Sequence, residues 1–344
     1  MSSSKFFNSS FIIRFSNGGG AVRFLVFGAG AIGSVFGGFL RRAGHDVTLV
    51  GRHDHMAVIA ERGLRISGIW GDHQITGLPT HESIAEVAGE RFDAVFLSVK
   101  SYDTETAMTQ LVEVPLAGEP PVVSLQNGLG NVETIARFVG AKRTIGGRVI
   151  FGVVVDEPGH CRVTVYAEEV MLGTIEPDAS LSGIIESLAK IISAAGIPTL
   201  PTDRIHAYLW AKILYNCSLN PTATLLETHY GELIEHEETR EILRRVVREV
   251  YAVAAARQVE MLVPTAEAYD KVLVGRLVPA TYDHHPSMLQ DIRAGRRTEI
   301  DALNGMIVRY GRECGIATPA NDLLTFLIRT LERSRRNRED RGSD

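Results

Sequence analysis

The sequence predicts an α/β fold in which a doubly wound parallel-sheet domain, residues 21–200, precedes an all-helical domain, residues 201–335. Three observations predict this: apolar runs that alternate with helical segments in the first half, a glycine-rich turn between the first strand and the first helix, and a change to helical periodicity from Asp203 onward. Residues 1–20, which are rich in serine, asparagine and glycine, are predicted to be a disordered extension, and residues 336–344 a disordered tail.

Strands are predicted in the first half at residues 23–27, 46–50, 92–99 and 121–126, with helical segments between them. Apolar runs of this length are typical of parallel strands that are buried on both faces. Residues 144–175 are β-rich around a turn at Glu157–Gly159, which predicts a hairpin appended to the sheet. A helix near 181–195 closes the domain.

The first strand runs directly into Gly28, Gly30 and Gly33, spaced as Gly-x-Gly-x-x-Gly, and then into an apolar helix through Leu40. Such glycines allow a tight turn and a close backbone approach to a pyrophosphate, which binds the free N–H groups at the helix N-terminus. The pattern alone is weak, but a strand before it and a helix after it indicate a Rossmann-type dinucleotide site. A strand–turn–helix without a ligand is the alternative.

Arg52 follows the second strand and favours NADP(H) as the dinucleotide. An NAD site usually carries an acid at this position for the ribose hydroxyls, whereas an arginine accommodates a 2′-phosphate. Asp54 lies two residues further on, so a solvent-facing Arg52 with Asp54 on the ribose is the competing interpretation.

Composition narrows the class of protein. The 344 residues are 45% hydrophobic with a net charge of −5 and no long basic run, which predicts two globular cores and no nucleic-acid partner. No apolar run reaches the roughly 18 residues that a membrane span requires. The three cysteines are widely separated, which favours reduced thiols and a cytoplasmic location. We expect a small-molecule partner, and a homodimer is left open.

The second half is predicted to form helices near 203–226, 236–257, 265–276, 287–294, 298–314 and 319–334. In the first of these, Lys212, Asn216 and Asn220 recur at four-residue steps, as one narrow polar line with Tyr208 along an otherwise apolar helix. An apolar helix is buried, so Lys212 needs a partner, a cavity or a ligand. The alternative is an exposed polar stripe on a surface helix.

Burial lowers the pKa of a lysine, which makes Lys212 a candidate general acid. Two carboxamides on the same face, those of Asn216 and Asn220, would orient a polar substrate. Asn220 precedes Pro221 and is therefore predicted to mark a break of the helix that faces a cleft.

Further candidates lie where strands end. Lys100 and Asn127 follow predicted strands, and ligands of open parallel sheets lie outside the carboxyl ends of the strands. Asn127–Gly128 is also a favoured turn pair, and Lys100 could be a solvated loop charge. Thr298 with an acid three residues later predicts a helix start, where Glu299 would only support the cap. No spacing of histidines or cysteines suits a metal site, so we predict none.

Together these motifs resemble the ketopantoate reductases (2-dehydropantoate 2-reductases). The resemblance covers about 22–330 and rests on the glycine turn, Arg52, Lys100, Gln126–Gly128, the polar line of Lys212, Asn216 and Asn220, and the segments Ser287–Arg293 and Thr298–Asp301. It implies NADPH-dependent reduction of ketopantoate to (R)-pantoate, toward pantothenate and coenzyme A, with hydride transfer to C2.

The resemblance also implies residue roles. Lys212 matches the proton donor and Glu299 the active-site carboxylate, which would help to keep the lysine charged. Asn127, Lys212, Asn216, Asn220 and Ser287 match the substrate contacts. The implied NADP(H) contacts are Gly28, Ala29, Gly30, Ala31, Ile32, Gly33, Arg52, Lys100, Asn127 and Glu299.

Two departures fall near the substrate. Tyr230 stands where some members carry a further asparagine, and Pro286 stands where a serine can precede Ser287. A paralogous NADPH-dependent reductase of another 2-oxoacid is therefore the alternative, and an NADP-binding sensor without catalytic activity is a second one.

Overall fold

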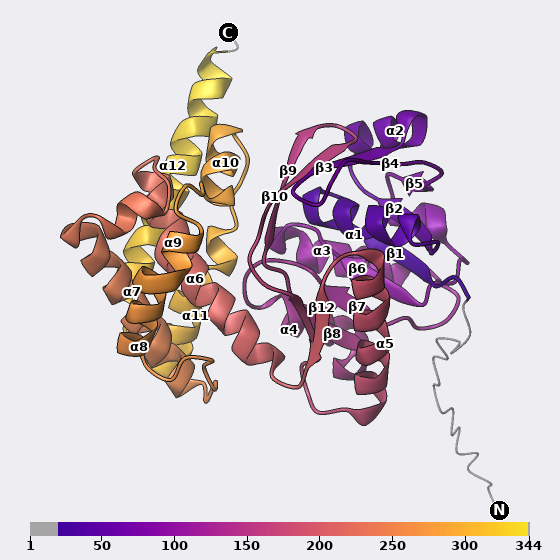
Figure 1. Cartoon of the computed structure of the whole chain (residues 1–344). Helices are drawn as coiled ribbons and strands as arrows, with labels where there is room; N and C mark the ends of the chain where they lie inside the picture. The colour runs from indigo at the N-terminus through magenta and orange to yellow at the C-terminus, as the bar shows by residue number, and fades with distance from the viewer. Residues whose placement is uncertain (1–19, 343–344) are drawn as a thin grey trace, which may run out of the picture.

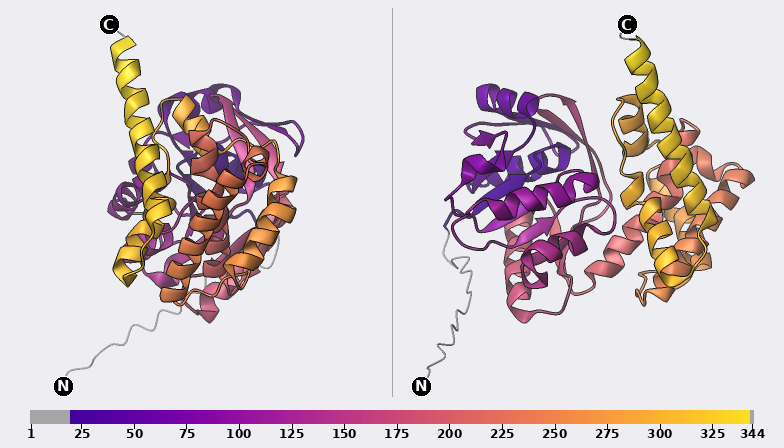
Figure 2. Two further views of the ribbon diagram at one scale, coloured as in Figure 1. Left: turned by 90° about the vertical axis from the view of Figure 1, so that its left-hand side faces the viewer. Right: turned by 180° about the vertical axis from the view of Figure 1, so that it is seen from behind.

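The computed structural model describes residues 20–342, with side chains through residue 335, so the predicted extension lies almost wholly outside the described residues. A sheet-containing part and a helical part lie side by side (Figures 1 and 2). The long helix α6 (Ile205–Leu225) leads from the first part into the second and contacts strands of the main sheet.

The main sheet has eight strands in the order β12-β11-β8-β7-β6-β1-β2-β5. Every neighbouring pair is parallel except β11 with β8, which is antiparallel. The strands are β1 (Arg23–Phe27), β2 (Asp46–Val50), β5 (Thr80–His81), β6 (Ala94–Leu97), β7 (Val122–Ser124), β8 (Thr144–Arg148), β11 (Val170–Thr174) and β12 (Thr199–Thr202).

Both faces of this sheet are covered by helices. In β1, Phe24 and Val26 belong to a core shared with α1 (Ala31–Arg42) and α5 (Ala179–Ala195). Leu25 and Phe27 point to the other core, shared with α3 (Thr104–Glu113) and α4 (Asn131–Val139). Helix α2 (His53–Arg62) follows β2. The predicted doubly wound α/β class is confirmed, and the strand order reverses between β1 and β6.

The hairpin expected at Glu157–Gly159 forms, but its assignment to the main sheet was wrong. Its strands β9 (Phe151–Glu157) and β10 (His160–Tyr166) join β3 (Leu64–Gly68) and β4 (His73–Ile75) in a separate four-stranded sheet of order β4-β3-β10-β9. The reason is burial, because Cys161 and Val163 of β10 pack into the same core as Ile66 of β3. Three short 3₁₀ turns complete this part: η1 (Ile84–Val87), η2 (Ser101–Asp103) and η3 (Ala141–Arg143).

The helical part packs around α6, against which α7 (Glu237–Ala256), α10 (Ser287–Arg293) and α12 (Pro319–Gly342) lie. Its remaining elements are η4 (Gly231–Ile234), α8 (Ala266–Val272), the π-helical turn η5 (Leu273–Leu277), α9 (Val278–Ala280), η6 (Ile300–Ala302) and α11 (Asn304–Cys314). Figure 2 shows the end of α12 extending past the other helices. Within residues 20–342, no helix has both the length and the apolar character needed to cross a membrane.

Two local predictions about helices were wrong. The helix expected at 298–314 begins only at Asn304. The reason is that Leu303 has a non-helical backbone (φ −98°, ψ −109°), which separates helix α11 from the preceding turn η6. Nor does α6 break at Asn220. It runs through Pro221, which has no N–H to donate to the carbonyl of Cys217, and the side-chain Nδ2 of Asn304 donates to that carbonyl instead at 3.0 Å.

Candidate active site

The glycine turn lies at the carboxyl end of β1, beside the end of β6. Gly28 has φ +94°, and a Cβ there would lie 2.4 Å from the backbone nitrogen of Val99. A Cβ on Gly33 would lie 2.4 Å from the Ser98 hydroxyl, so this glycine lets α1 pack closely on the sheet. At Gly30 a Cβ would meet no atom closer than 3.9 Å. The open side of Gly30 is therefore the side where a ligand can approach the backbone.

The first turn of α1 suits a phosphate group. The N–H groups of Ala31, Ile32 and Gly33 have no acceptor within residues 20–342, and they lie at the positive end of the helix dipole. The N–H of Ala29 instead donates to the carbonyl of Val50 at 2.9 Å. Ala29 thus holds the turn in place, while the next three residues present free donors that fit a dinucleotide pyrophosphate.

Arg52 lies at the end of β2, at the N-cap of α2. Its side chain is exposed and makes no hydrogen bond or ion pair with the described residues. Asp54, the competing candidate for the ribose, lies exposed in the first turn of the same helix. This surface therefore carries an exposed guanidinium, unpaired among the described residues, that is available to an anionic group.

A continuous set of polar contacts connects the predicted catalytic residues. The Lys212 Nζ donates to Asn127 Oδ1 at 2.6 Å and to the carbonyl of Val149 at 2.5 Å. The Asn127 Nδ2 donates to Glu299 Oε2 at 3.3 Å. Asn127 is thus hydrogen-bonded both to the lysine of α6 and to the carboxylate that precedes η6.

Lys212 has neutral acceptors and a nearby positive charge. Its pKa is lowered from 10.5 to about 8, mainly by burial and to a smaller extent by the positive charge of Arg148, while the negative charge of Glu299 opposes the lowering. Arg148 is itself buried, and its guanidinium donates to Glu168 at 2.7 Å. A lysine with this pKa is partly protonated at neutral to mildly alkaline pH and can release its proton readily.

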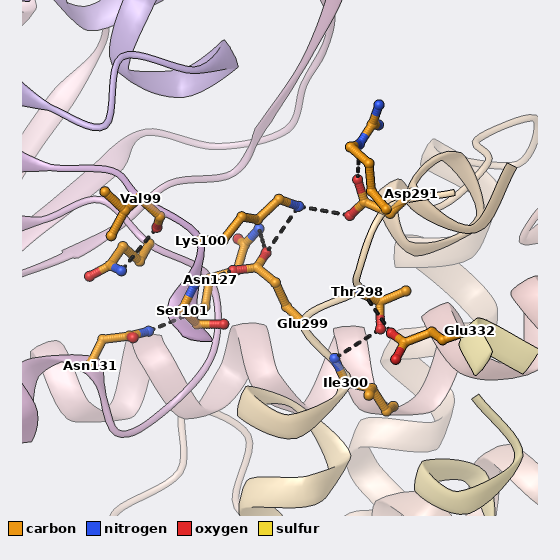
Figure 3. A network of polar contacts seen from close by, with 12 residues as sticks. Val99, Lys100, Ser101, Asn127, Asn131, Asp291, Thr298, Glu299, Ile300 and Glu332 are labelled. Carbon is orange, nitrogen blue, oxygen red and sulfur yellow. Dashed lines mark hydrogen bonds and ion pairs between the residues drawn. The ribbon is translucent and has the colours of Figure 1, made fainter. Parts of the chain in front are cut away.

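Lys100 joins the two parts of the molecule and approaches the same oxygen of Glu299 that accepts from Asn127 (Figure 3). Its Nζ donates to the buried carboxylate of Asp291 at 2.7 Å and lies 3.8 Å from Glu299 Oε2. Burial opposes its charge, but the two carboxylates outweigh that effect, and the pKa of Lys100 is raised. Glu299 Oε1 also accepts a hydrogen bond from the N–H of Ser101 at 2.9 Å. Residues of the sheet-containing part thus contact both oxygens of this buried carboxylate.

The end of β7 is held in place by a second set of hydrogen bonds. Asn131 Nδ2 donates to the backbone carbonyl of Asn127 at 2.8 Å. Gln126 Nε2 donates to the carbonyl of Val99 at 3.0 Å and to the Thr104 hydroxyl at 2.7 Å. These contacts fix the loops after β6 and β7, and thereby the position of the Asn127 carboxamide.

A small pocket opens beside these groups. It is lined by Asn127, Asn216, Asn220, Ser287, Met288, Asp291, Glu299 and Leu303. Asn216 and Asn220 enter it from α6, and the exposed Ser287 enters it from the start of α10. The structure therefore brings Asn127, Asn216, Asn220 and Ser287, four of the five predicted substrate contacts, to one pocket. The fifth, Lys212, is not one of the lining residues, but its ammonium donates to Asn127, which is. Within the described residues, no group of three or more His, Cys, Asp or Glu residues could hold a metal ion.

Several contributors to the site were not predicted, among them Asp291, Val149 and Arg148. Asp291 lies one helical turn after Ser287, a spacing that places both on one face of α10 and that could have indicated it. Val149 contributes only a backbone carbonyl, which no residue pattern reveals. Arg148 affects Lys212 through space from β8, and its proximity depends on the packing of α6 against that strand.

The fold and this site define a two-domain oxidoreductase in which a nucleotide-binding sheet meets a helical domain. Residues 24–177 match the family model "Ketopantoate reductase PanE/ApbA", and residues 204–332 match "Ketopantoate reductase PanE/ApbA C terminal". The chain belongs to the ketopantoate reductase family, whose members use a nicotinamide cofactor.

Individual relatives agree with this family. The chain is 38% identical to the 2-dehydropantoate 2-reductase of Aquifex aeolicus, covering 90% of this chain and 97% of that protein. It is 34% identical to the Pyrococcus abyssi enzyme of the same name, covering 90% and 98%. A Ralstonia eutropha ketopantoate reductase structure superposes with a TM-score of 0.81 at 32% identity, covering 91% and 99%. A D-mandelate dehydrogenase solved with NADH and anilino(oxo)acetate also reaches 0.81, at 27% identity with the same coverage.

Proposed function

We propose that this protein reduces 2-dehydropantoate (ketopantoate) to (R)-pantoate with NADPH, a step of pantothenate biosynthesis. The observation that carries the proposal is the environment of Lys212. Its ammonium is held by Asn127 and Val149, has a lowered pKa, and lies beside a pocket lined by carboxamides. Such a group is a proton donor suited to an alkoxide that forms nearby.

The proposed chemistry divides between cofactor and protein. Bound NADPH supplies a hydride to the C2 carbonyl carbon of the substrate. Lys212 stabilises the negative charge that grows on the carbonyl oxygen and gives that oxygen its proton. Asn127 and Val149 hold the ammonium in place. The negative charge of Glu299 opposes the lowering of the lysine pKa through space and so helps to keep the donor protonated before turnover.

The proposed preference for NADPH rests on Arg52. Its guanidinium is exposed and unpaired within the described residues, at the end of β2, where the ribose of a dinucleotide lies in this fold class. The glycine turn with Ala31, Ile32 and Gly33 would hold the pyrophosphate. We assign the nicotinamide end of the cofactor to Lys100, Asn127 and Glu299, which lie outside the carboxyl ends of β6 and β7 or close to them.

The proposed substrate fits the polar character of the pocket. Ketopantoate carries a carboxylate, a ketone and a terminal hydroxyl group, and Asn216, Asn220 and Ser287 offer hydrogen-bonding groups to them. The likeness to a D-mandelate dehydrogenase favours one alternative, a reductase of a different 2-oxoacid with an aryl group in place of the branched hydroxyalkyl group. Tyr230 and Pro286, which depart from the pattern of the family, lie close enough to this pocket to make that alternative worth testing.

The decisive experiment follows the loss of NADPH absorbance with ketopantoate and with a panel of other 2-oxoacids, including phenylglyoxylate. We expect ketopantoate to give the highest kcat/KM. Faster consumption of the aryl acid would replace the proposal with its alternative. Tight NADPH binding without turnover of any 2-oxoacid would instead support a sensor, a role for which a buried proton donor such as Lys212 has no evident use.

A further inference from the structure

The carboxamide of Asn220, which lines the pocket, is held in orientation by a residue outside the pocket lining. Asn220 Oδ1 accepts a hydrogen bond from the hydroxyl of Tyr230 at 2.6 Å. Both residues are buried, with exposed fractions of 5% for Asn220 and 3% for Tyr230. Tyr230 does not line the pocket, whereas Asn220 does. Any effect of Tyr230 on a bound molecule must therefore pass through Asn220.

The direction of this hydrogen bond follows from the number of donors and acceptors. A phenol has a single proton, and within the described residues the Tyr230 hydroxyl has no other acceptor than Asn220 Oδ1. With the carboxamide reversed, the buried phenol proton would lose its partner, which is costly. Burial, and to a smaller extent Tyr215, raises the pKa of Tyr230 well above 10, so the phenol keeps its proton.

The same count of donors and acceptors leaves the Nδ2 group of the Asn220 carboxamide available to a ligand. Asn220 Nδ2 makes no hydrogen bond with the described residues, and Asn220 lines the pocket. Because Oδ1 is occupied by Tyr230, the group that this side chain can present to a ligand is an N–H donor. That donor matches an oxygen acceptor of the substrate, such as a carboxylate or hydroxyl oxygen.

We propose that Tyr230 is a positioning residue that holds Asn220 with its N–H toward the pocket, and so selects a 2-oxoacid that places an oxygen acceptor there. This inference rests on the proposed function. It assigns a role to a residue at which this chain departs from the pattern of its family, because an asparagine at position 230 has a shorter side chain and carries no hydroxyl.

The Tyr230 ring is itself well fixed. It packs edge-on against Tyr215, with ring centroids 5.6 Å apart and an interplanar angle of 90°, and lies 5.2 Å from the ring of His284. Its backbone N–H donates to the carbonyl of His284 at 3.1 Å. The hydroxyl is thus aimed by packing on several sides, and this rigidity allows it to set the orientation of Asn220.

The test compares Tyr230→Phe with the wild type in steady-state reduction of ketopantoate by NADPH. Loss of the hydroxyl frees Asn220 to turn, so we expect the KM for ketopantoate to rise about tenfold, the effect typical of one unsatisfied buried group. We expect kcat to fall less than about threefold and the KM for NADPH to stay constant, because Lys212 and the glycine turn are untouched. In an Asn220→Ala background, Tyr230→Phe should leave the KM unchanged.

Two further variants keep the test decisive. Tyr251→Phe is the matched control, because it removes a hydroxyl that bonds the carbonyl of Val263 at 2.8 Å, away from the pocket. If Tyr230→Phe does not fold, Asn220→Asp replaces it: the carboxylate still accepts from Tyr230 but has no N–H, and the KM should rise as before.

An unchanged KM in Tyr230→Phe, or an equal rise with Asn220 removed, would overturn the positioning role. A wild-type protein without activity on any 2-oxoacid would instead reject the proposed function.

Discussion

The glycine turn and the cluster around Glu299 are built in different ways. The turn is formed by one continuous segment, in which Gly28, Gly30 and Gly33 each have a separate steric role and three consecutive N–H groups have no acceptor among the described residues. The Glu299 cluster instead joins Lys100, Asn127, Lys212 and Asp291, which come from four separate segments. The proposed phosphate site is thus encoded locally, whereas the proposed chemistry depends on how the two parts of the molecule pack.

This difference implies that the two functions can be separated by mutation. A change in the cluster should affect turnover without affecting the dinucleotide, and a change near the turn should do the reverse. Lys100 lies between these cases because its ion pair with Asp291 connects the two parts. The following predictions are ordered from the largest expected effect to the smallest.

Replacing Lys212 with alanine should have the largest effect. Loss of the proton donor should lower kcat for ketopantoate by about 10³-fold, within the range typical of general acids. The dissociation constant of NADPH, measured by its fluorescence, should stay within about twofold of the wild type, because the glycine turn is intact. The exposed Lys190→Ala serves as the control. Normal turnover by Lys212→Ala would refute the assignment of the acid.

Replacing Arg52 with alanine should do the opposite. We expect the KM for NADPH to rise by about 10 to 100-fold, the effect of losing a charge-assisted hydrogen bond to a phosphate, while the KM for NADH hardly changes. At saturating NADPH, kcat should be retained. Steady-state kinetics with both cofactors provide the measurement. The companion variant Asp54→Ala examines the competing interpretation: if Asp54→Ala raises the KM for NADPH and Arg52→Ala leaves it unchanged, the ribose is held by the acid and the 2′-phosphate argument fails.

The local features of the fold could be predicted from the sequence. Strand, turn and helix around Gly28 follow from composition and spacing, and the change of periodicity near Asp203 lies just before α6 at Ile205. The hairpin at Glu157–Gly159 was predicted as a local element but assigned to the wrong sheet. Its pairing with β3 connects residues nearly a hundred positions apart, and no local pattern specifies such a partner.

The candidate site shows the same limit. A four-residue spacing was enough to place Asn216 and Asn220 on one line that enters the pocket. The role of Glu299 could not be predicted from such a spacing. The residues around it suggested only a helix cap, and the family resemblance alone indicated an active-site carboxylate. Its actual partners, the Ser101 N–H and Asn127 Nδ2, come from loops about 170 to 200 residues earlier. The uninterrupted course of α6 at Pro221 likewise depends on Asn304, a residue from another helix.

Lys100→Met tests whether the two parts of the molecule are coupled. The variant keeps an unbranched side chain but removes the ion pair, leaving Asp291 with the guanidinium of Arg296, 2.9 Å away. The Lys100 side chain is 37% exposed, so the loss should be modest, about 1 kcal/mol or fivefold. We expect this loss to appear as a rise in the KM values of both NADPH and ketopantoate. A change confined to one substrate would show that Lys100 serves a single part.

Arg148→Gln should have the smallest effect, a shift of the pH profile. Reduction requires protonated Lys212, so kcat/KM should fall as the pH rises above about 8, the pKa of that lysine in the free enzyme. Arg148 lowers this pKa by its positive charge, and removing the charge should move the alkaline limb upward by about half a pH unit. The pH dependence of kcat/KM, measured from pH 6 to about 10, gives the comparison.

The matched control for Arg148→Gln is Arg162→Gln, because Arg162 also forms a close carboxylate pair, with Asp156 at 2.7 Å, but on the hairpin sheet. The alkaline limb of the kcat/KM profile of Arg162→Gln should coincide with that of the wild type. A limb that does not move in Arg148→Gln, or that moves to lower pH, would mean that a group other than Lys212 controls it. The direction of the shift thus connects a buried arginine of β8 to the proton donor of α6, a link that arises only when the two parts of the molecule are packed together.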